Sequence, residues 1–329
     1  MARIVRFYEL GGPEVLKIEE INMAPPGQGE VQIRVKAIGL NRAEALFRAG
    51  KYLEHPQLPS TLGYEASGII EKVDSSVTNF TVGDVVSIVP PLGLGKYGIY
   101  GEVANVPAQY VVKHPSWLSF EEAAALWMQY LTAYGAIIDI AQLKTGDYLV
   151  IPAASSSVGL AAIQLAHLVG ATPIALTRTQ EKKSALFEAG ATHVIVTEEE
   201  KVSEKILEIT KGVGARVVFD PVGGKTVIEL AKAMSSGGIL FQYGALSMEP
   251  TPFPFSQAMK KGLSMRGYVL FEIVMDSVRF EKAKKFILNA LEARQLKPLI
   301  AKTFAFDQIV EAHRYLESNQ QMGKIIVTV

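Results

Sequence analysis

The 329-residue chain contains no cysteine. This absence excludes disulfide bonds, thiolate nucleophiles and every zinc site that uses a cysteine ligand. The 5 histidines do not take over as metal ligands, because they are scattered along the chain and no two of them stand at ligand spacing. The sequence therefore predicts no bound metal.

An excess of one charge and long apolar runs are also missing. Lys plus Arg and Asp plus Glu number 33 each, so the chain has no basic field for nucleic acid. No uncharged apolar run approaches the roughly 18 residues of a membrane span, and the N-terminus has no signal-like apolar segment. We therefore expect a cytoplasmic protein with no membrane or nucleic-acid partner. Its hydrophobic content of 49% and its length allow two domains with large cores.

The most informative segment runs from Thr145 to Arg178. An apolar run ends in small residues, these open an apolar helix, and a second apolar run follows at Pro173–Leu176. This order is typical of a βαβ unit with a tight turn, in which backbone N–H groups at a helix N-terminus reach a pyrophosphate. The segment predicts a dinucleotide site.

The turn departs from the usual glycine-rich pattern. Its three glycine positions are Ala153, Ser156 and Gly159, and only the last is a glycine. Gly159 would allow close packing of the helix on the strand, and the serine hydroxyls could cap the helix or bind a phosphate. An ordinary N-capped helix is the alternative interpretation.

The end of the second strand indicates which dinucleotide is bound. Sites for NAD usually carry an acidic residue there to hold the ribose 2′-hydroxyl. This chain has Thr177 and Arg178 at that place, followed by Lys182. Two cations favour a 2′-phosphate and hence NADPH over NADH. Alternatively, both cations are solvated surface charges.

The rest of the chain predicts an α/β protein with a β-rich start. Short strands are expected at Val31–Ala37, Ala66–Val73 and Val85–Val89, and Ser119 with Glu122 forms a capping box. Six further strands alternate with helices and match a doubly wound parallel sheet. They are Tyr148–Pro152, Thr172–Leu176, His193–Val196, Arg216–Phe219, Gly238–Tyr243 and Met265–Val269. The tail adds a helix (Asp276–Arg294), a strand (Leu299–Phe304), a helix after Phe306 and a last strand (Lys324–Val329).

A series of segments in fixed order identifies a family. They include GGPEVLKIEE, GEVQIRVKAIGLNRAEALFRAGKY, GYEASGIIEKV, FDPVGG, GGILFQYGALS, SMRGY and GKIIV. The chain thus resembles the zinc-independent, zeta-crystallin-like quinone oxidoreductases of the medium-chain dehydrogenase/reductase superfamily. The resemblance implies a GroES-like β-barrel catalytic domain over 1–121, completed by 271–329, and a Rossmann domain over 122–270. It also implies a homodimer that pairs through a Rossmann edge strand, expected at Gly238–Tyr243; the alternative is that this segment is a core strand of one sheet.

The resemblance also bears on metal. Zinc-dependent relatives carry a cysteine after the VKAIG-type strand and a histidine before the glutamate of the GYEASG-type segment. Asn41 and Tyr64 stand in those regions here, so zinc is not expected. Glu65 is either a structural carboxylate paired with an arginine or a catalytic one.

Four catalytic candidates come from the matched segments. Asn41 would orient the substrate or the nicotinamide amide, and Tyr52 would donate a phenol hydrogen bond. Tyr64 would face the vacated metal position, and Thr132 would meet the nicotinamide. The alternatives are that Asn41 only tolerates a left-handed turn, that Tyr52 packs its ring, and that Thr132 bonds its own backbone.

The cofactor residues implied by the resemblance fall into three groups. Ser156, Ser157, Val158 and Gly159 would cradle the pyrophosphate. Thr177, Arg178 and Lys182 would surround the 2′-phosphate. Tyr243, Gly244, Ala245, Leu270 and Lys324 would lie against the nicotinamide and its ribose. Thr197 stands where many members carry a tyrosine, which is a departure from the family.

These observations predict an enzyme. Without a Lewis acid, hydride transfer from NADPH to a quinone or an α,β-unsaturated carbonyl is easier than alcohol oxidation, because a hydrogen-bond donor suffices to stabilise the charge on a distant oxygen. An alcohol dehydrogenase, an enoyl-thioester reductase and a non-catalytic NADPH-binding protein are the alternatives.

Overall fold

The structure is a computed structural model that describes residues 1–329. Its contacts divide the chain into two compact units. Unit 1 comprises Met1–Met128 and Pro298–Val329, and unit 2 comprises Gln129–Lys297. These boundaries differ from those expected at 121/122 and 270/271. The long helix α10 (Ser277–Glu292) belongs to unit 2, because it packs on α9 (Phe271–Val274) and the π-helix η3 (Tyr134–Ile140).

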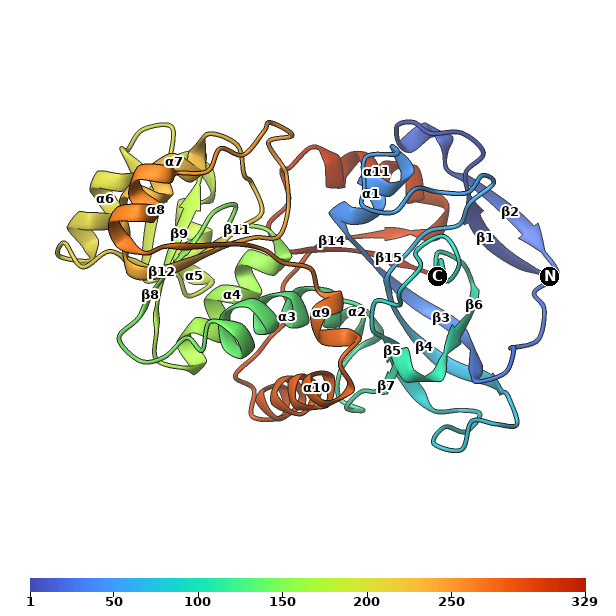
Figure 1. Cartoon of the computed structure of the whole chain (residues 1–329). Coiled ribbons are helices and arrows are strands. Elements are labelled where there is room, and N and C mark those ends of the chain that lie inside the picture. The colour runs from blue at the N-terminus through green and yellow to red at the C-terminus, as the bar shows by residue number, and fades with distance from the viewer. The chain divides into compact units, whose positions relative to one another are not determined.

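Unit 2 contains a six-stranded parallel sheet, with helices packed around its strands (Figure 1). The spatial order is β10-β9-β8-β11-β12-β13, which corresponds to the order 3-2-1-4-5-6 of a Rossmann fold. The strands are β8 (Tyr148–Ile151), β9 (Thr172–Thr177), β10 (His193–Val196), β11 (Ala215–Asp220), β12 (Met234–Gln242) and β13 (Ser264–Gly267). The expected doubly wound sheet is confirmed. Its strand order reverses between β8 and β11, and ligands of such sheets bind beyond the carboxyl ends at that point.

The helices between these strands follow the predicted pattern. They are α4 (Ser157–Leu168), α5 (Lys183–Glu188), α6 (Val202–Ile209), α7 (Thr226–Lys232) and α8 (Phe255–Lys261). Helix α4 is apolar on nearly every side and packs on β8 and β9. Val150 and Ile174 of those strands are fully buried in the core of the sheet. Each such side chain contributes about 1.5–3 kcal/mol to stability, so truncating Val150 would open a cavity in this core, which also contains Ile206 of α6 and Val227 of α7.

The expectation of an edge strand at Gly238–Tyr243 is wrong. Strand β12 pairs with β11 on one side and with β13 on the other, so it lies inside the sheet. The edge strands are β10 and β13. The apolar pattern of a parallel strand reports that it is buried on both faces, and it carries no information about its neighbours in the sheet.

Unit 1 is built on a seven-stranded sheet of order β14-β15-β3-β4-β5-β7, with β6 paired to β3. The strands are β3 (Glu30–Leu40), β4 (Glu65–Val73), β5 (Val85–Ile88), β6 (Val103–Pro107), β7 (Val111–Lys113), β14 (Ile300–Ala305) and β15 (Lys324–Thr328). A separate pair, β1 (Ala2–Arg6) and β2 (Lys17–Ile21), lies beside them. Strand β15 pairs antiparallel with β3, which makes the tail part of unit 1.

Short helices complete unit 1 (Figure 1). They include α1 (Arg42–Arg48), α2 (Phe120–Ala123) and α11 (Ile309–Glu317). Helix α3 (Trp127–Ala133) begins in unit 1 and continues into unit 2. The capping box predicted at Ser119 and Glu122 is confirmed at the start of α2.

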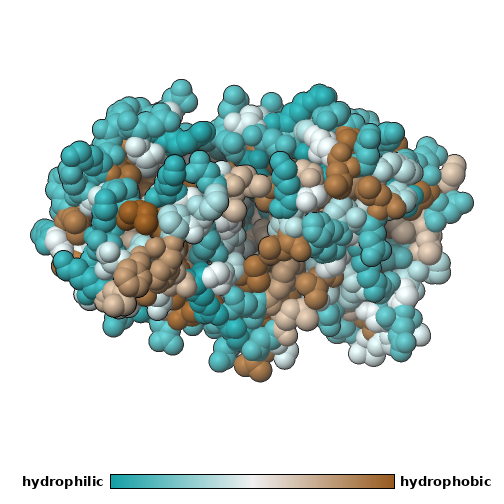
Figure 2. Space-filling model, turned by 45° about the horizontal axis from the view of Figure 1, so that its top comes forward, coloured by the Kyte–Doolittle hydropathy of each residue, from teal (hydrophilic) through white to brown (hydrophobic).

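The surface is mainly hydrophilic on the face shown in Figure 2, where hydrophobic residues form separate patches rather than one continuous band. No helix combines the length with the apolar character that crossing a membrane demands.

Candidate functional site

The turn between β8 and α4 forms a tight elbow in unit 2. Ser156 is the N-cap of α4, and its Oγ accepts a hydrogen bond from the Gly159 N–H at 3.1 Å. Ala153, at the first glycine position, has φ of +49°, the left-handed conformation that this turn needs. A Cβ on Gly159 would lie 2.6 Å from the Ala154 carbonyl oxygen. The helix therefore touches the turn that precedes it at Gly159, and this close approach leaves no room for a side chain there. Ser157 and Val158 are the first two residues of the helix.

Two cations and a hydroxyl converge beyond β9. Thr177 is buried at the end of that strand, and the exposed Arg178 follows it. The Lys182 Nζ donates to the Ser155 Oγ at 3.3 Å. Burial, and then the neighbouring Arg178 charge, lower the pKa of Lys182. Since two cations repel each other when no anion lies between them, this arrangement is suited to a doubly charged group such as a phosphate.

The ends of β11 and β12 carry the third group of predicted cofactor residues. The buried Asp220 carboxylate accepts hydrogen bonds from the backbone N–H groups of Val222 at 2.7 Å and Gly223 at 3.1 Å. The Tyr243 ring stacks on Phe219 with centroids 4.0 Å apart. Burial, followed by the nearby Asp220, raises the pKa of Tyr243. A Cβ on Gly244 would lie 2.8 Å from the Pro221 carbonyl oxygen, so this turn has no room for a side chain there. Ala245 follows in the same turn.

Thr132 and Leu270 lie on neighbouring elements of unit 2. Thr132 is buried near the end of α3, just before η3, and Leu270 is buried directly before α9. The Tyr268 hydroxyl donates to the Leu131 carbonyl at 3.4 Å, so the loop that carries Leu270 is tied to the helix that carries Thr132. A π-helix such as η3 is rare and is frequently found at functional sites.

Unit 1 contains a buried ion pair at the predicted position of Lys324. This residue is 1% exposed, and its Nζ donates to the Glu65 Oε2 and the Asn41 Oδ1, both at 2.6 Å. The Glu65 Oε1 accepts from the backbone N–H groups of Leu126 at 2.8 Å and Trp127 at 2.5 Å, at the start of α3. Glu65 is therefore a structural carboxylate, and its partner is a lysine rather than the expected arginine.

The side chain of Asn41 is fixed by hydrogen bonds, like that of Lys324. It caps α1 with φ of −131°, which is extended backbone, so the alternative of a left-handed turn is wrong. Its Nδ2 donates to the Gly39 carbonyl at 3.0 Å and to the Glu44 Oε1 at 3.2 Å. Both amide hydrogens and the amide oxygen of Asn41 thus have partners within unit 1.

Tyr52 and Tyr64 form a pair of phenols in unit 1. Their ring centroids lie 6.4 Å apart at 67°, and their hydroxyl groups are hydrogen-bonded to each other. Tyr64 is buried and Tyr52 is half-buried. Burial is the largest cause that raises the pKa of each phenol. Both therefore keep their protons at neutral pH and can act as hydrogen-bond donors.

The sequence analysis missed Glu44, which is fully buried on α1. Its carboxylate accepts from the Asn41 backbone N–H at 2.7 Å and from the Tyr64 backbone N–H at 2.8 Å. The signal was present, because Asn41 followed three residues later by Glu44 is a capping box.

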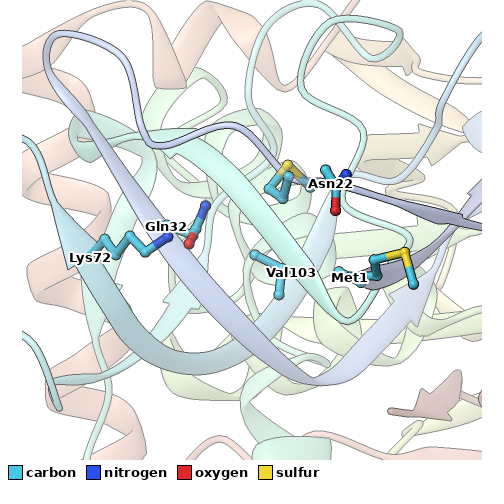
Figure 3. Close-up of a pocket in the computed structure, with 7 residues that line it drawn as sticks. Met1, Asn22, Gln32, Lys72 and Val103 are labelled. Atoms are coloured by element: carbon cyan, nitrogen blue, oxygen red, sulfur yellow. The ribbon is translucent and has the colours of Figure 1, made fainter.

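Two hollows on unit 1 lie away from the predicted site residues. One of about 230 Å³ is lined by Met1, Asn22, Gln32, Lys72 and Val103, among others (Figure 3). A second, of about 290 Å³, shares Val103 and Met23 with it. Neither contains a predicted site residue, so these hollows do not mark the chemistry.

Two family models match the chain. Residues 27–116 match the alcohol dehydrogenase GroES-like domain, and residues 157–289 match the zinc-binding dehydrogenase family. The residues present do not fit zinc, because no group of three or more His, Cys, Asp or Glu side chains could hold a metal ion. The two buried carboxylates of unit 1, Glu44 and Glu65, are instead saturated by donors from the protein itself.

Full-length relatives accompany these matches. The Escherichia coli quinone oxidoreductase 1 is 31% identical, over 99% of both chains. The Burkholderia 2-haloacrylate reductase is 30% identical, over 99% of this chain and 98% of the relative. The crystal structure of the Escherichia coli quinone oxidoreductase complexed with NADPH superimposes with a TM-score of 0.92 over 100% of both chains. The chain belongs to the quinone oxidoreductase family of the medium-chain dehydrogenase/reductase superfamily.

Proposed function

We propose that this protein is an NADPH-dependent reductase that transfers hydride to quinones or α,β-unsaturated carbonyls without zinc. The observation that carries the proposal is the convergence of Arg178, Lys182 and Ser155 beside the serine elbow. The relatives support it, because one of them was solved with NADPH and another is named for reduction of an α,β-unsaturated acid.

Unit 2 holds the cofactor in this proposal. The residues Ser156, Ser157, Val158 and Gly159 bind the pyrophosphate with backbone N–H groups at the start of α4. Arg178 and Lys182 bind the 2′-phosphate, with Ser155 beside them and Thr177 beneath. Thr132, Tyr243, Gly244, Ala245 and Leu270 contact the nicotinamide and its ribose. When bound, NADPH supplies the hydride.

Unit 1 supplies the hydrogen-bond donors. Tyr52 and Tyr64 act as a pair: their hydroxyl groups are bonded to each other, so one phenol donates to the other, which donates to the oxygen of the acceptor and stabilises its negative charge. Asn41 and Lys324 have a different task from the one implied by the resemblance. They bind each other, Lys324 also binds Glu65, and Asn41 also binds Glu44, so they fix the walls of the site rather than reach for the cofactor.

The decisive experiment compares the two nicotinamide cofactors. Arg178→Ala should raise the Kd of NADPH about tenfold or more and leave that of NADH unchanged, because a hydrogen bond to a charged group contributes about 1.5–3 kcal/mol. Equal weakening of both cofactors would refute the 2′-phosphate assignment. Oxidation of NADPH with a panel of quinones and enones, in the presence of a chelator, tests the zinc-free reaction. Binding without turnover of any acceptor would instead support a non-catalytic role.

A homodimer is part of the proposal. Strand β13 is an edge of the sheet and offers unpaired backbone groups. The segment before it exposes Phe253, Phe255 and Met259, at 59%, 64% and 72% of their surfaces. Exposed aromatic side chains next to an open strand edge favour pairing with a second copy. Sedimentation of the wild type and of Phe255→Lys tests this, with a shift to monomer expected for the variant. Fractionation of cells would test the proposed cytoplasmic location.

A further inference from the structure

Glu44 occupies the centre of a buried polar cluster in unit 1. Its Oε1 accepts from the Tyr64 N–H at 2.8 Å and the Asn41 Nδ2 at 3.2 Å. Its Oε2 accepts from the Asn41 N–H at 2.7 Å and the Tyr100 hydroxyl at 2.5 Å. Glu44 therefore holds both of the segments that carry Asn41 and Tyr64.

A chain of hydrogen bonds leads to this carboxylate from the surface. The half-buried Glu317 accepts from the Arg48 Nη2 at 2.6 Å, and the Arg48 Nη1 lies 2.8 Å from the His313 Nδ1. The His313 Nε2 lies 3.3 Å from the Tyr100 hydroxyl, which contacts Glu44. Arg48, His313 and Tyr100 are each at most 2% exposed.

The direction of every hydrogen bond in this chain follows from Arg48. A guanidinium group only donates, so the His313 Nδ1 must be the acceptor. The single hydrogen of the neutral His313 ring is then on Nε2 and points to the Tyr100 oxygen. The Tyr100 hydrogen is left to point to Glu44. All bonds from Arg48 onward therefore run toward the Glu44 carboxylate.

The direction of these hydrogen bonds determines whether the Glu44 carboxyl group is ionised. Burial raises its pKa, but each of its neighbours presents a hydrogen, and none offers a lone pair to a carboxylic acid proton. The ionised form is the one that fits this set of donors.

We propose that Glu44 is a positioning residue of the reductase site, which fixes Tyr64 and Asn41 through a carboxylate that Arg48, His313 and Tyr100 orient. This inference rests on the proposed function, because it assumes that the Tyr64 phenol and its partner Tyr52 serve the acceptor. Glu44 acts through these neighbours and needs no contact with substrate or cofactor.

The first test is Glu44→Gln, which keeps the shape of the side chain and replaces one oxygen with an amide group. The amide group donates hydrogens, but every neighbour of either carboxylate oxygen is also a donor. Tyr100 cannot turn its hydroxyl round to accept from the amide, because His313 already donates to the Tyr100 oxygen. We expect kcat with a quinone or enone to fall about tenfold or more, since small misplacements near the reacting atoms are costly. The Kd of NADPH should not change, because its proposed ligands lie in unit 2.

Glu122→Gln is the matched control. Glu122 is also the third residue of a capping box in unit 1, but it is not buried, and its partner is the Ser119 backbone. A glutamine can replace a glutamate in such a box, so kcat should stay at the wild-type level. Equal losses in both variants would mean that Glu44 only stabilises its helix.

If Glu44→Gln does not fold, Tyr100→Phe tests whether the Glu44 carboxylate positions the site. This variant removes only the hydroxyl that donates to Glu44. It should lower kcat severalfold and leave the Kd of NADPH unchanged. A double-mutant cycle that combines Glu44→Gln with Tyr64→Phe gives an independent readout. The losses of kcat in the two single variants should be less than additive in the double variant if Glu44 acts through Tyr64.

The outcomes separate the two proposals. An active wild type whose Glu44→Gln and Tyr100→Phe variants keep full kcat overturns the role of Glu44 and leaves the reductase function standing. Strict additivity in the cycle overturns it as well. A wild type that reduces no acceptor refutes the reductase function, and the role of Glu44 fails with it.

Discussion

The elbow of unit 2 and the buried cluster of unit 1 are constructed in opposite ways. The elbow and the cations beside it come from one continuous segment, Ala153 to Lys182, whose polar groups are partly exposed. The cluster joins residues from Asn41 to Lys324, and its charges are buried and paired. The comparison teaches that a binding surface can be exposed and local, whereas a site that must stay rigid without a metal needs partners from across the fold.

The strongest test of this contrast is Lys324→Met. Removing one partner of a buried pair should lower the free energy of unfolding by about 3–5 kcal/mol, because Glu65 is left with an uncompensated charge. Denaturation by urea measures this change. Lys201→Met breaks an exposed pair with Glu204 on the surface of unit 2 and should change the free energy of unfolding far less, because solvent screens that pair. Equal effects of the two substitutions would show that the buried pair at Lys324 contributes no more to stability than an exposed pair.

The second test uses pH. Burial, followed by the charge of Arg48, lowers the pKa of His313 to about 3 from its usual 6.5. Between these values the unfolded chain binds more protons, so stability is full above about pH 6.5 and falls as the pH drops toward 3. His313→Gln keeps an acceptor for Arg48 and a donor for Tyr100 but cannot titrate. The wild type should lose about 2 kcal/mol more than this variant between pH 6.5 and 4.5, by the linkage relation.

His55→Gln serves as the control for this experiment. His55 is exposed, and its replacement should leave the free energy of unfolding at pH 6.5 as in the wild type. Identical pH profiles for the wild type and His313→Gln would contradict the buried, neutral state of His313.

A smaller effect is expected at the cation pair. Lys182→Met should raise the Kd of NADPH severalfold, by about 1 kcal/mol, and less than Arg178→Ala, because an ammonium group is a point charge and a guanidinium group binds phosphate as a fork. Titration at two salt concentrations measures it, and the salt dependence should be weaker in the variant. No change in either quantity would remove Lys182 from the phosphate site.

The smallest effect is expected at the elbow itself. Ala153→Gly relieves a left-handed conformation that costs a residue with a side chain about 1–2 kcal/mol, and the added freedom of the unfolded chain offsets about half of this gain. We expect a net stabilisation of about 0.5–1 kcal/mol by urea unfolding. Ala161→Gly, in the middle of α4, should destabilise by about 1 kcal/mol. Destabilisation at both positions would mean that the elbow is not strained.

Much of the fold follows from local pattern. The strands of unit 2 were predicted to within a few residues, because buried parallel strands appear as short apolar runs separated by helices. The position of β12 inside the sheet does not follow from local pattern, since packing between elements decides which strands are neighbours. Glu65 illustrates the same limit, because its partner, Lys324, lies 259 residues away in the chain.

The sequence by itself determined the family, the Rossmann sheet and the cation-lined elbow, because each depends on residues close together in the chain and on the periodicity of burial. Only the tertiary structure decided that Asn41 and Lys324 bind each other, that Glu44 gathers four donors, and that Tyr52 and Tyr64 pair their phenols. The physical reason is that a buried polar group must find a partner wherever the fold places one. The identity of that partner is a property of the packed chain and not of its neighbours in sequence.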